Sequence, residues 1–115
     1  MKNTPENREA LNTMAAACEG TRYQIHIGQY GHGDDAVIYP CISTLREVPK
    51  YTPEVYMDVD ILEEEDTLVL RVQTTSYGAL PPSEITQVAE GLLNATNLVN
   101  RLAAIAAGYG IHIKP

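Results

Sequence analysis

The chain has 115 residues, with 15 Asp or Glu against 8 Lys or Arg and a formal net charge of −7, and this length fits a single domain over residues 1–115. The mixed composition excludes wholesale disorder and coiled coils, and the acidic excess argues against direct nucleic-acid binding. The first residues lack a signal peptide and there is no apolar run of about 18 residues, so we expect a cytoplasmic protein that does not associate with membranes.

The N-terminus predicts a helix over residues 5–19. Thr4 is a favourable N-cap, and Pro5 suits the first helical position, where a backbone N–H has no partner inside the helix. Apolar residues then recur at helical spacing, and Gly20 provides a left-handed stop.

Two short strands are expected next. Residues 21–29 alternate between apolar and polar, and residues 28–35 contain three glycines and two aspartates, which indicates a loop. A second strand is predicted over residues 36–43, where Pro40 restricts it to a sheet edge or a bulge. Residues 44–53 then form a surface connection.

The clearest pattern predicts an antiparallel hairpin. Residues 54–61 and residues 67–75 both alternate in hydrophobicity, and the acidic segment 63–66 joins them. This clean alternation implies one buried face and one face in water.

A long C-terminal helix is predicted over residues 83–107, with Ser83 as its N-cap, and residues 111–115 suffice for one more short strand. The apolar stripe that we expect to face the sheet comprises Ile85, Val88, Ala89, Leu92, Ala95, Thr96, Val99, Ala103 and Ala106. A second stripe in the later half comprises Leu98, Leu102 and Ile105.

These elements predict an α+β fold. Strands that follow one another between two helices favour a four- to five-stranded, mainly antiparallel sheet. We expect the N-terminal helix and the long C-terminal helix to pack on one face of this sheet.

The acidic hairpin is the main candidate for a functional surface. One-signed surfaces steer association with partners of opposite charge, so we expect a protein partner with a basic surface, such as one that handles nucleic acid. The candidate partner-binding residues are Glu54, Tyr56, Asp58, Asp60, Glu63, Glu64, Glu65 and Asp66. The alternative is a strand whose outward charges only prevent edge-to-edge association.

The resulting hypothesis is a small acidic, non-catalytic binding protein that acts as a regulator or inhibitor. Its size and charge also suit an antagonist encoded by a phage or another mobile element. Residues 63–66 lack the spacing of a calcium loop, and the chain contains no nucleophile motif, so we expect no cofactor, no metal site and no catalytic residues.

Two other function classes remain as alternatives. The stripe of Leu98, Leu102 and Ile105 predicts a structural or assembly protein that forms a homodimer, unless the first helix covers the stripe. The loop with His32, Asp34 and Asp35 suggests a small-molecule- or metal-binding enzyme. Two Ile-His-Ile segments, at residues 25–27 and 111–113, would place His26 and His112 on one face if their strands were neighbours.

Overall fold

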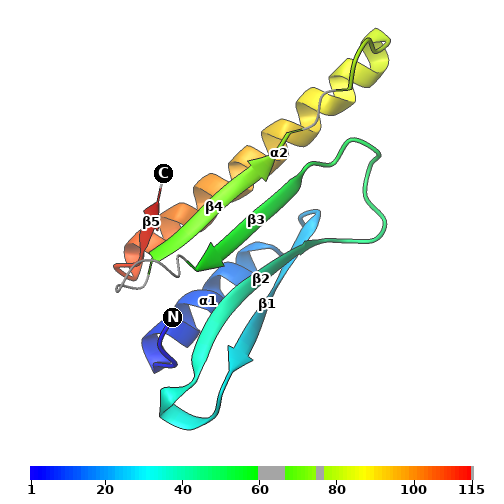
Figure 1. Ribbon diagram of the computed structural model, residues 1–115. Helices are drawn as coiled ribbons and strands as arrows, with labels where there is room; N and C mark the ends of the chain where they lie inside the picture. Colours follow the sequence, from blue (N-terminus) through cyan, green and yellow to red (C-terminus); the bar gives the residue numbers. More distant parts are fainter. Residues whose placement is uncertain (60–66, 75–76, 115) are drawn as a thin grey trace.

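The structure is a computed structural model that describes residues 1–59, 67–74 and 77–114. This part of the chain combines two long helices with β-strands, which confirms the α+β class (Figure 1). In chain order, the elements are α1 (Pro5–Ala17), β1 (Tyr23–Tyr30), the 3₁₀ turn η1 (Gly33–Asp35), β2 (Val37–Thr44), β3 (Glu54–Val59), β4 (Thr67–Gln73), α2 (Pro82–Gly108) and β5 (His112–Lys114).

Helix α1 begins where the sequence predicts it. The Thr4 hydroxyl accepts a hydrogen bond from the Asn7 backbone N–H at 3.1 Å, and Pro5 occupies the first helical position. The helix ends at Ala17, and the chain turns away through Gly20, whose φ of +76° is a conformation that favours glycine. The predicted helix is therefore confirmed, two residues shorter at its C-terminus.

The strands form two sheets, which corrects the predicted sheet of four to five strands. β1 pairs with β2 in antiparallel register, while β4 pairs with β3 in antiparallel and with β5 in parallel register. β2 and β3 contact each other, but no backbone ladder joins them. Pro40, which has no N–H to donate, lies on β2. Among the strands of the described chain, β2 pairs only with β1 and is therefore an edge strand, as Pro40 predicted.

The sequence predicted a loop from residue 28, but β1 continues through Gly28 to Tyr30. Gly28 pairs directly with Tyr39 of β2. A Cβ atom on Gly28 would lie 2.2 Å from the Tyr39 ring, so the ring occupies the space that a side chain would need. The aromatic ring thus replaces the packing that glycine cannot provide in a strand.

Helix α2 differs from the prediction in both its cap and its buried side. Its N-cap is Pro81, which makes no side-chain capping bond, and Ser83 lies inside the helix. Ile85 is 53% exposed, because the first turns of α2 extend past the strands (Figure 1). The residues of α2 that are buried are Gly91, Ala95, Leu98, Leu102 and Ala106.

Gly91 allows α2 to approach the connection before β3. A Cβ atom at this position would lie 2.6 Å from the Tyr51 carbonyl oxygen and 3.3 Å from Pro53 Cδ. The glycine therefore sets how closely the helix and the 51–53 segment can pack.

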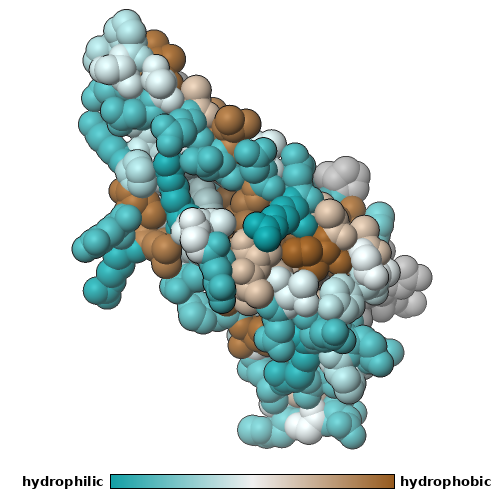
Figure 2. Space-filling view, turned by 180° about the vertical axis from the view of Figure 1, so that it is seen from behind, coloured by the Kyte–Doolittle hydropathy of each residue, from teal (hydrophilic) through white to brown (hydrophobic). Residues whose placement is uncertain are grey.

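The two helices lie on the same side of the strands, although these strands form two sheets and not the single predicted one (Figure 1). A cluster of buried apolar side chains from α1, α2 and the inward faces of the strands fills the space between these layers. Seen from the helix side, hydrophilic residues cover most of the surface and apolar groups form separate patches (Figure 2). None of the helices in the described ranges has the length and hydropathy needed to cross a membrane.

Candidate functional site

The candidate surface is the outer side of β3, turned away from the helices. Val55 and Met57 point into the core, so the residues that alternate with them along β3 point into water. We call these outward residues, Glu54, Tyr56 and Asp58, the hairpin face. All three are exposed, as the alternating sequence predicted, and Tyr56 retains 48% of its surface in water.

Tyr56 is held at the centre of this face by its hydroxyl group. The hydroxyl donates a hydrogen bond to the Glu54 carboxylate, and its oxygen lies 2.7 Å from the side-chain amide oxygen of Gln73. The bond to Glu54 raises the pKa of Tyr56 above its usual value, since ionisation would place a phenolate beside a carboxylate. The Tyr56 ring is therefore exposed to water, while the hydrogen bond of its hydroxyl group fixes its orientation.

Glu54 stands between two hollows of the surface. One hollow, about 350 Å³, lies between β2 and β3, where no backbone ladder joins the strands. The second, about 260 Å³, lies between the 51–53 segment and the end of β4. Their lining residues besides Glu54 are Ile42, Ser43, Thr44, Val55 and Tyr56 in the first, and Thr52, Pro53, Gln73 and Tyr77 in the second.

None of the acidic groups of the hairpin face forms an ion pair with a basic side chain of the described part of the chain. Arg71 lies opposite Tyr56 on β4, but its Nη1 donates to the Leu70 carbonyl oxygen at 3.0 Å. Asp58 accepts a hydrogen bond from the Val59 backbone N–H at 2.8 Å and forms no ion pair there. A cationic group of another molecule would therefore meet carboxylates that form no ion pair within the described chain, with Arg71 on the neighbouring strand.

The rest of the predicted acidic set lies outside the described residues. These positions are Asp60, Glu63, Glu64, Glu65 and Asp66. The geometry of the site therefore rests on the hairpin face alone.

Sequence reasoning did not include Gln73 or Ser43 in this site. Gln73 is the direct cross-strand partner of Glu54, so a register count along the predicted hairpin could have found it. Ser43 comes from β2, and its position beside β3 depends on how the two sheets meet. The local sequence carries no signal for that contact.

The stripe of Leu98, Leu102 and Ile105, predicted as an oligomer interface, packs against the core of the same chain. Leu102 is fully buried, Leu98 is buried, and Ile105 is partly buried against the same core, where α1 packs against α2. These three residues therefore supply packing inside one chain, which is the alternative that the sequence left open. A homodimer stays a prediction, but this stripe no longer supports it.

The histidine–aspartate loop remains an exposed turn. His32, Asp34 and Asp35 are all exposed, and in the ranges 1–59, 67–74 and 77–114 no three His, Cys, Asp or Glu side chains group as a metal site. His26 and His112 lie on strands of different sheets. The strands that carry them are not neighbours, so the condition for bringing these histidines together is not met.

Comparison of the chain with protein-family models, curated proteins and solved structures gives no match. The functional interpretation is therefore drawn from the geometry itself. The hairpin face offers carboxylates that form no ion pair within the described chain, an oriented phenol ring and two adjoining hollows, a combination suited to binding a cationic group.

Proposed function

We propose that this protein is a small, non-catalytic binding protein that docks its hairpin face on a basic surface of a partner protein. It would act as a regulator or inhibitor by covering that surface. A protein that handles nucleic acid is the favoured partner class, because such proteins carry clustered Lys and Arg for phosphate contacts.

The observation that carries the proposal is the arrangement around Tyr56. Its ring is exposed, yet its hydroxyl is bonded to Glu54, so little side-chain freedom is lost when a partner packs on it. Tyrosine is enriched among the residues that dominate binding energy, and here it lies between two carboxylates.

The hollow between β2 and β3 gives a cationic side chain a place to insert. Glu54 and Tyr56 line this hollow, so a Lys or Arg of the partner entering it would meet a carboxylate and a ring face. Attraction between the carboxylates of the hairpin face and the basic surface would speed the encounter, and these short-range contacts would slow dissociation.

A decalysine peptide is a suitable probe of this proposal. We expect the double variant Glu54→Gln/Asp58→Asn to bind it about fivefold more weakly, which corresponds to roughly 1 kcal/mol. Tyr56→Ala should lose about tenfold, because it removes the anchoring ring. Fluorescence anisotropy of a labelled peptide in buffers of rising NaCl would measure both effects.

The matched control is Asp34→Asn/Asp35→Asn, which removes the same two charges from the exposed η1 turn. This control should bind decalysine nearly as well as the parent chain. Equal losses in both double variants would show that only net charge matters, and the proposed docking face would then be wrong.

A further inference from the structure

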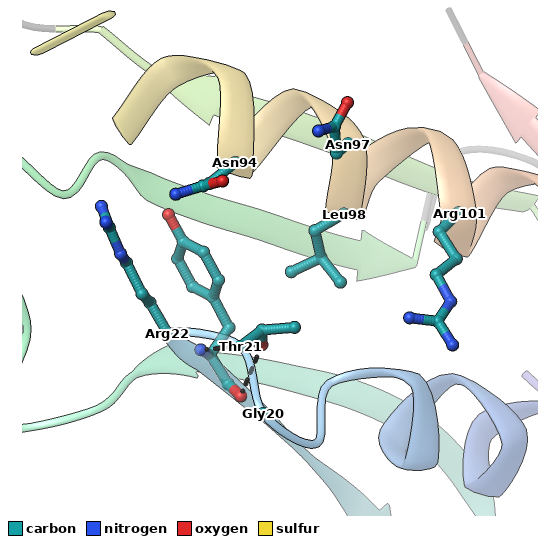
Figure 3. Close-up of a pocket in the computed structure, with 8 residues that line it drawn as sticks. Gly20, Thr21, Arg22, Asn94, Asn97, Leu98 and Arg101 are labelled. Carbon is teal, nitrogen blue, oxygen red and sulfur yellow. Dashed lines mark hydrogen bonds between the residues drawn. The ribbon is translucent and has the colours of Figure 1, made fainter. Parts of the chain in front are cut away.

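A cavity of about 280 Å³ lies on the helix side of the molecule, between α2 and the segment that follows α1 (Figure 3). We call it the arginine pocket. It is lined by Gly20, Thr21, Arg22, Tyr23, Asn94, Asn97, Leu98 and Arg101. No residue of the hairpin face contributes to it, so it is a separate site.

The lining of the arginine pocket is basic, although the chain as a whole is strongly acidic. Two of its residues are arginines, and no Asp or Glu of the described ranges lines it. Arg22 meets one carboxylate, that of exposed Glu90, at 3.3 Å. Arg101 forms neither a hydrogen bond nor an ion pair with any part of the described chain, which leaves its guanidinium available to a ligand.

The two guanidinium groups stand at opposite ends of the pocket. Arg22 extends beside the Asn94 end of the α2 segment, and Arg101 projects from its other end (Figure 3). Asn94 and Arg101 are seven positions apart on α2, which corresponds to about 10 Å along a helix axis. Between these ends, Leu98 points toward the 20–23 segment, whereas the side chain of Asn97 points away from it (Figure 3).

The walls between the arginines are mixed in character. Leu98 is buried and apolar, while the side chain of Asn94 provides an amide donor and acceptor. Tyr23 is fixed in place because its hydroxyl donates to the Pro53 carbonyl oxygen at 2.5 Å. The pocket thus combines a fixed wall with a cationic group at each end.

We propose that the arginine pocket binds a small organic anion that carries two acidic groups, one for each arginine. The planar guanidinium fork matches the oxygens of carboxylate and phosphate, so either can supply the acidic groups. The volume sits at the lower end for small-molecule sites, which fits a compact metabolite and excludes a folded macromolecule from the interior.

A ligand in the arginine pocket would compete with Glu90 for the guanidinium of Arg22. This carboxylate is the anion that Arg22 holds in the ligand-free chain, and it is mostly exposed. An entering acidic group would take over the Arg22 guanidinium and release Glu90. Removing the charge of Glu90 should therefore strengthen ligand binding, whereas removing an arginine should weaken it.

The test uses calorimetric titration of the full chain in a low-salt, phosphate-free buffer, with pyrophosphate, glutarate and acetate as probes. We expect saturable binding of pyrophosphate, glutarate or both, and at least about tenfold weaker binding of acetate, which has one acidic group. Binding of pyrophosphate alone assigns a phosphorylated ligand, and binding of glutarate alone assigns a dicarboxylate. Acetate that binds as tightly as the other probes would overturn the two-group proposal.

Variants then locate the binding. Arg101→Gln should weaken the preferred probe at least about tenfold, and Arg101→Lys should recover only part of the loss, because the lysine keeps the charge but not the fork. Glu90→Gln should tighten binding by roughly threefold, as expected for the loss of one exposed competing charge.

Arg71→Gln is the matched control, since it makes the same change of charge on β4, outside the pocket. It should leave the affinity within about twofold of the parent value, because exposed charges separated by more than about 10 Å are largely screened. Failure of all probes to saturate, or equal losses in Arg71→Gln and Arg101→Gln, would overturn the inference. Neither result would bear on the decalysine test of the hairpin face.

Discussion

The hairpin face and the arginine pocket differ in charge, in shape and in how the chain builds them. The hairpin face is acidic and exposed, and its three residues come from one strand. The arginine pocket is basic and concave, and its two arginines are separated by most of the chain. One small protein of net charge −7 therefore presents two surfaces of opposite sign.

This difference shows that the net charge of a protein does not determine the charge of each part of its surface. Composition reports an average, whereas a binding partner meets only the groups within a screening length of about 8–10 Å. Here the acids gather on the hairpin, and the fold brings Arg22 and Arg101 to a place that no acid of the described chain lines. A basic site can thus exist in an acidic chain without any basic cluster in its sequence.

The largest effect is expected in the core beneath the arginine pocket. Leu102→Ala, one turn after the pocket residue Leu98, should lower the free energy of unfolding by about 3 kcal/mol, because it opens a cavity at a fully buried site. Urea denaturation followed by circular dichroism measures this loss.

Leu93→Ala is the control for this change, since Leu93 lies on the same helix and is 60% exposed. We expect it to change stability by no more than about 0.5 kcal/mol. If Leu102→Ala lowered the free energy of unfolding no more than Leu93→Ala does, the burial of Leu102 in the core would be wrong.

Gly91→Ala should have the next largest effect, and it tests a part of the fold next to both regions. The added methyl group would collide with the Tyr51 carbonyl oxygen, so α2 must move away from the 51–53 segment. We expect a loss of about 1–3 kcal/mol in the same denaturation experiment. Thr52 accepts a bond from Arg22, and Pro53 precedes Glu54, so a shift of this segment would reach both sites.

Gly108→Ala provides the matched substitution at the end of the same helix. A Cβ atom there meets nothing within 4 Å, so stability should stay within about 0.5 kcal/mol of the parent. A Gly91→Ala variant as stable as Gly108→Ala would contradict the close approach of α2 to the 51–53 segment.

The smallest expected effects are two titrations that report the sign of the local potential. On the hairpin face, the Glu54 carboxylate raises the pKa of Tyr56, so Glu54→Gln should lower it. The phenolate therefore forms at a lower pH in the variant, which absorbance at the phenolate band records. Asp34→Asn should leave this titration unchanged.

Beside the arginine pocket, burial raises the pKa of the Cys18 thiol, while the Arg101 guanidinium acts in the opposite direction. Arg101→Gln should therefore raise the pKa of Cys18 further, and thiolate absorbance in a Cys41→Ser background would detect the change. A shift in the reverse direction would show that the two regions do not differ in sign as described.

The sequence alone determined the features that depend on neighbours along the chain. Side chains in a strand alternate between two faces, so the outward placement of Glu54, Tyr56 and Asp58 followed from the pattern of polar and apolar residues. The start of α1 was also predictable, because the Thr4 cap and Pro5 act within one helical turn.

Only the tertiary structure decided how these elements meet. The predicted stripe on α2 fails at Ile85, which is as apolar as a core residue but lies where the helix extends past the strands, whereas Ala95 and Ala106 of the same stripe are buried. Leu98 and Leu102 are core residues because α1 packs against α2, and a helical period cannot show which neighbour a face will have. The break between β2 and β3 has the same origin, and so does the placement of Arg22 and Arg101 around one pocket. In both cases the distance between segments far apart in the sequence is set by packing rather than by local geometry.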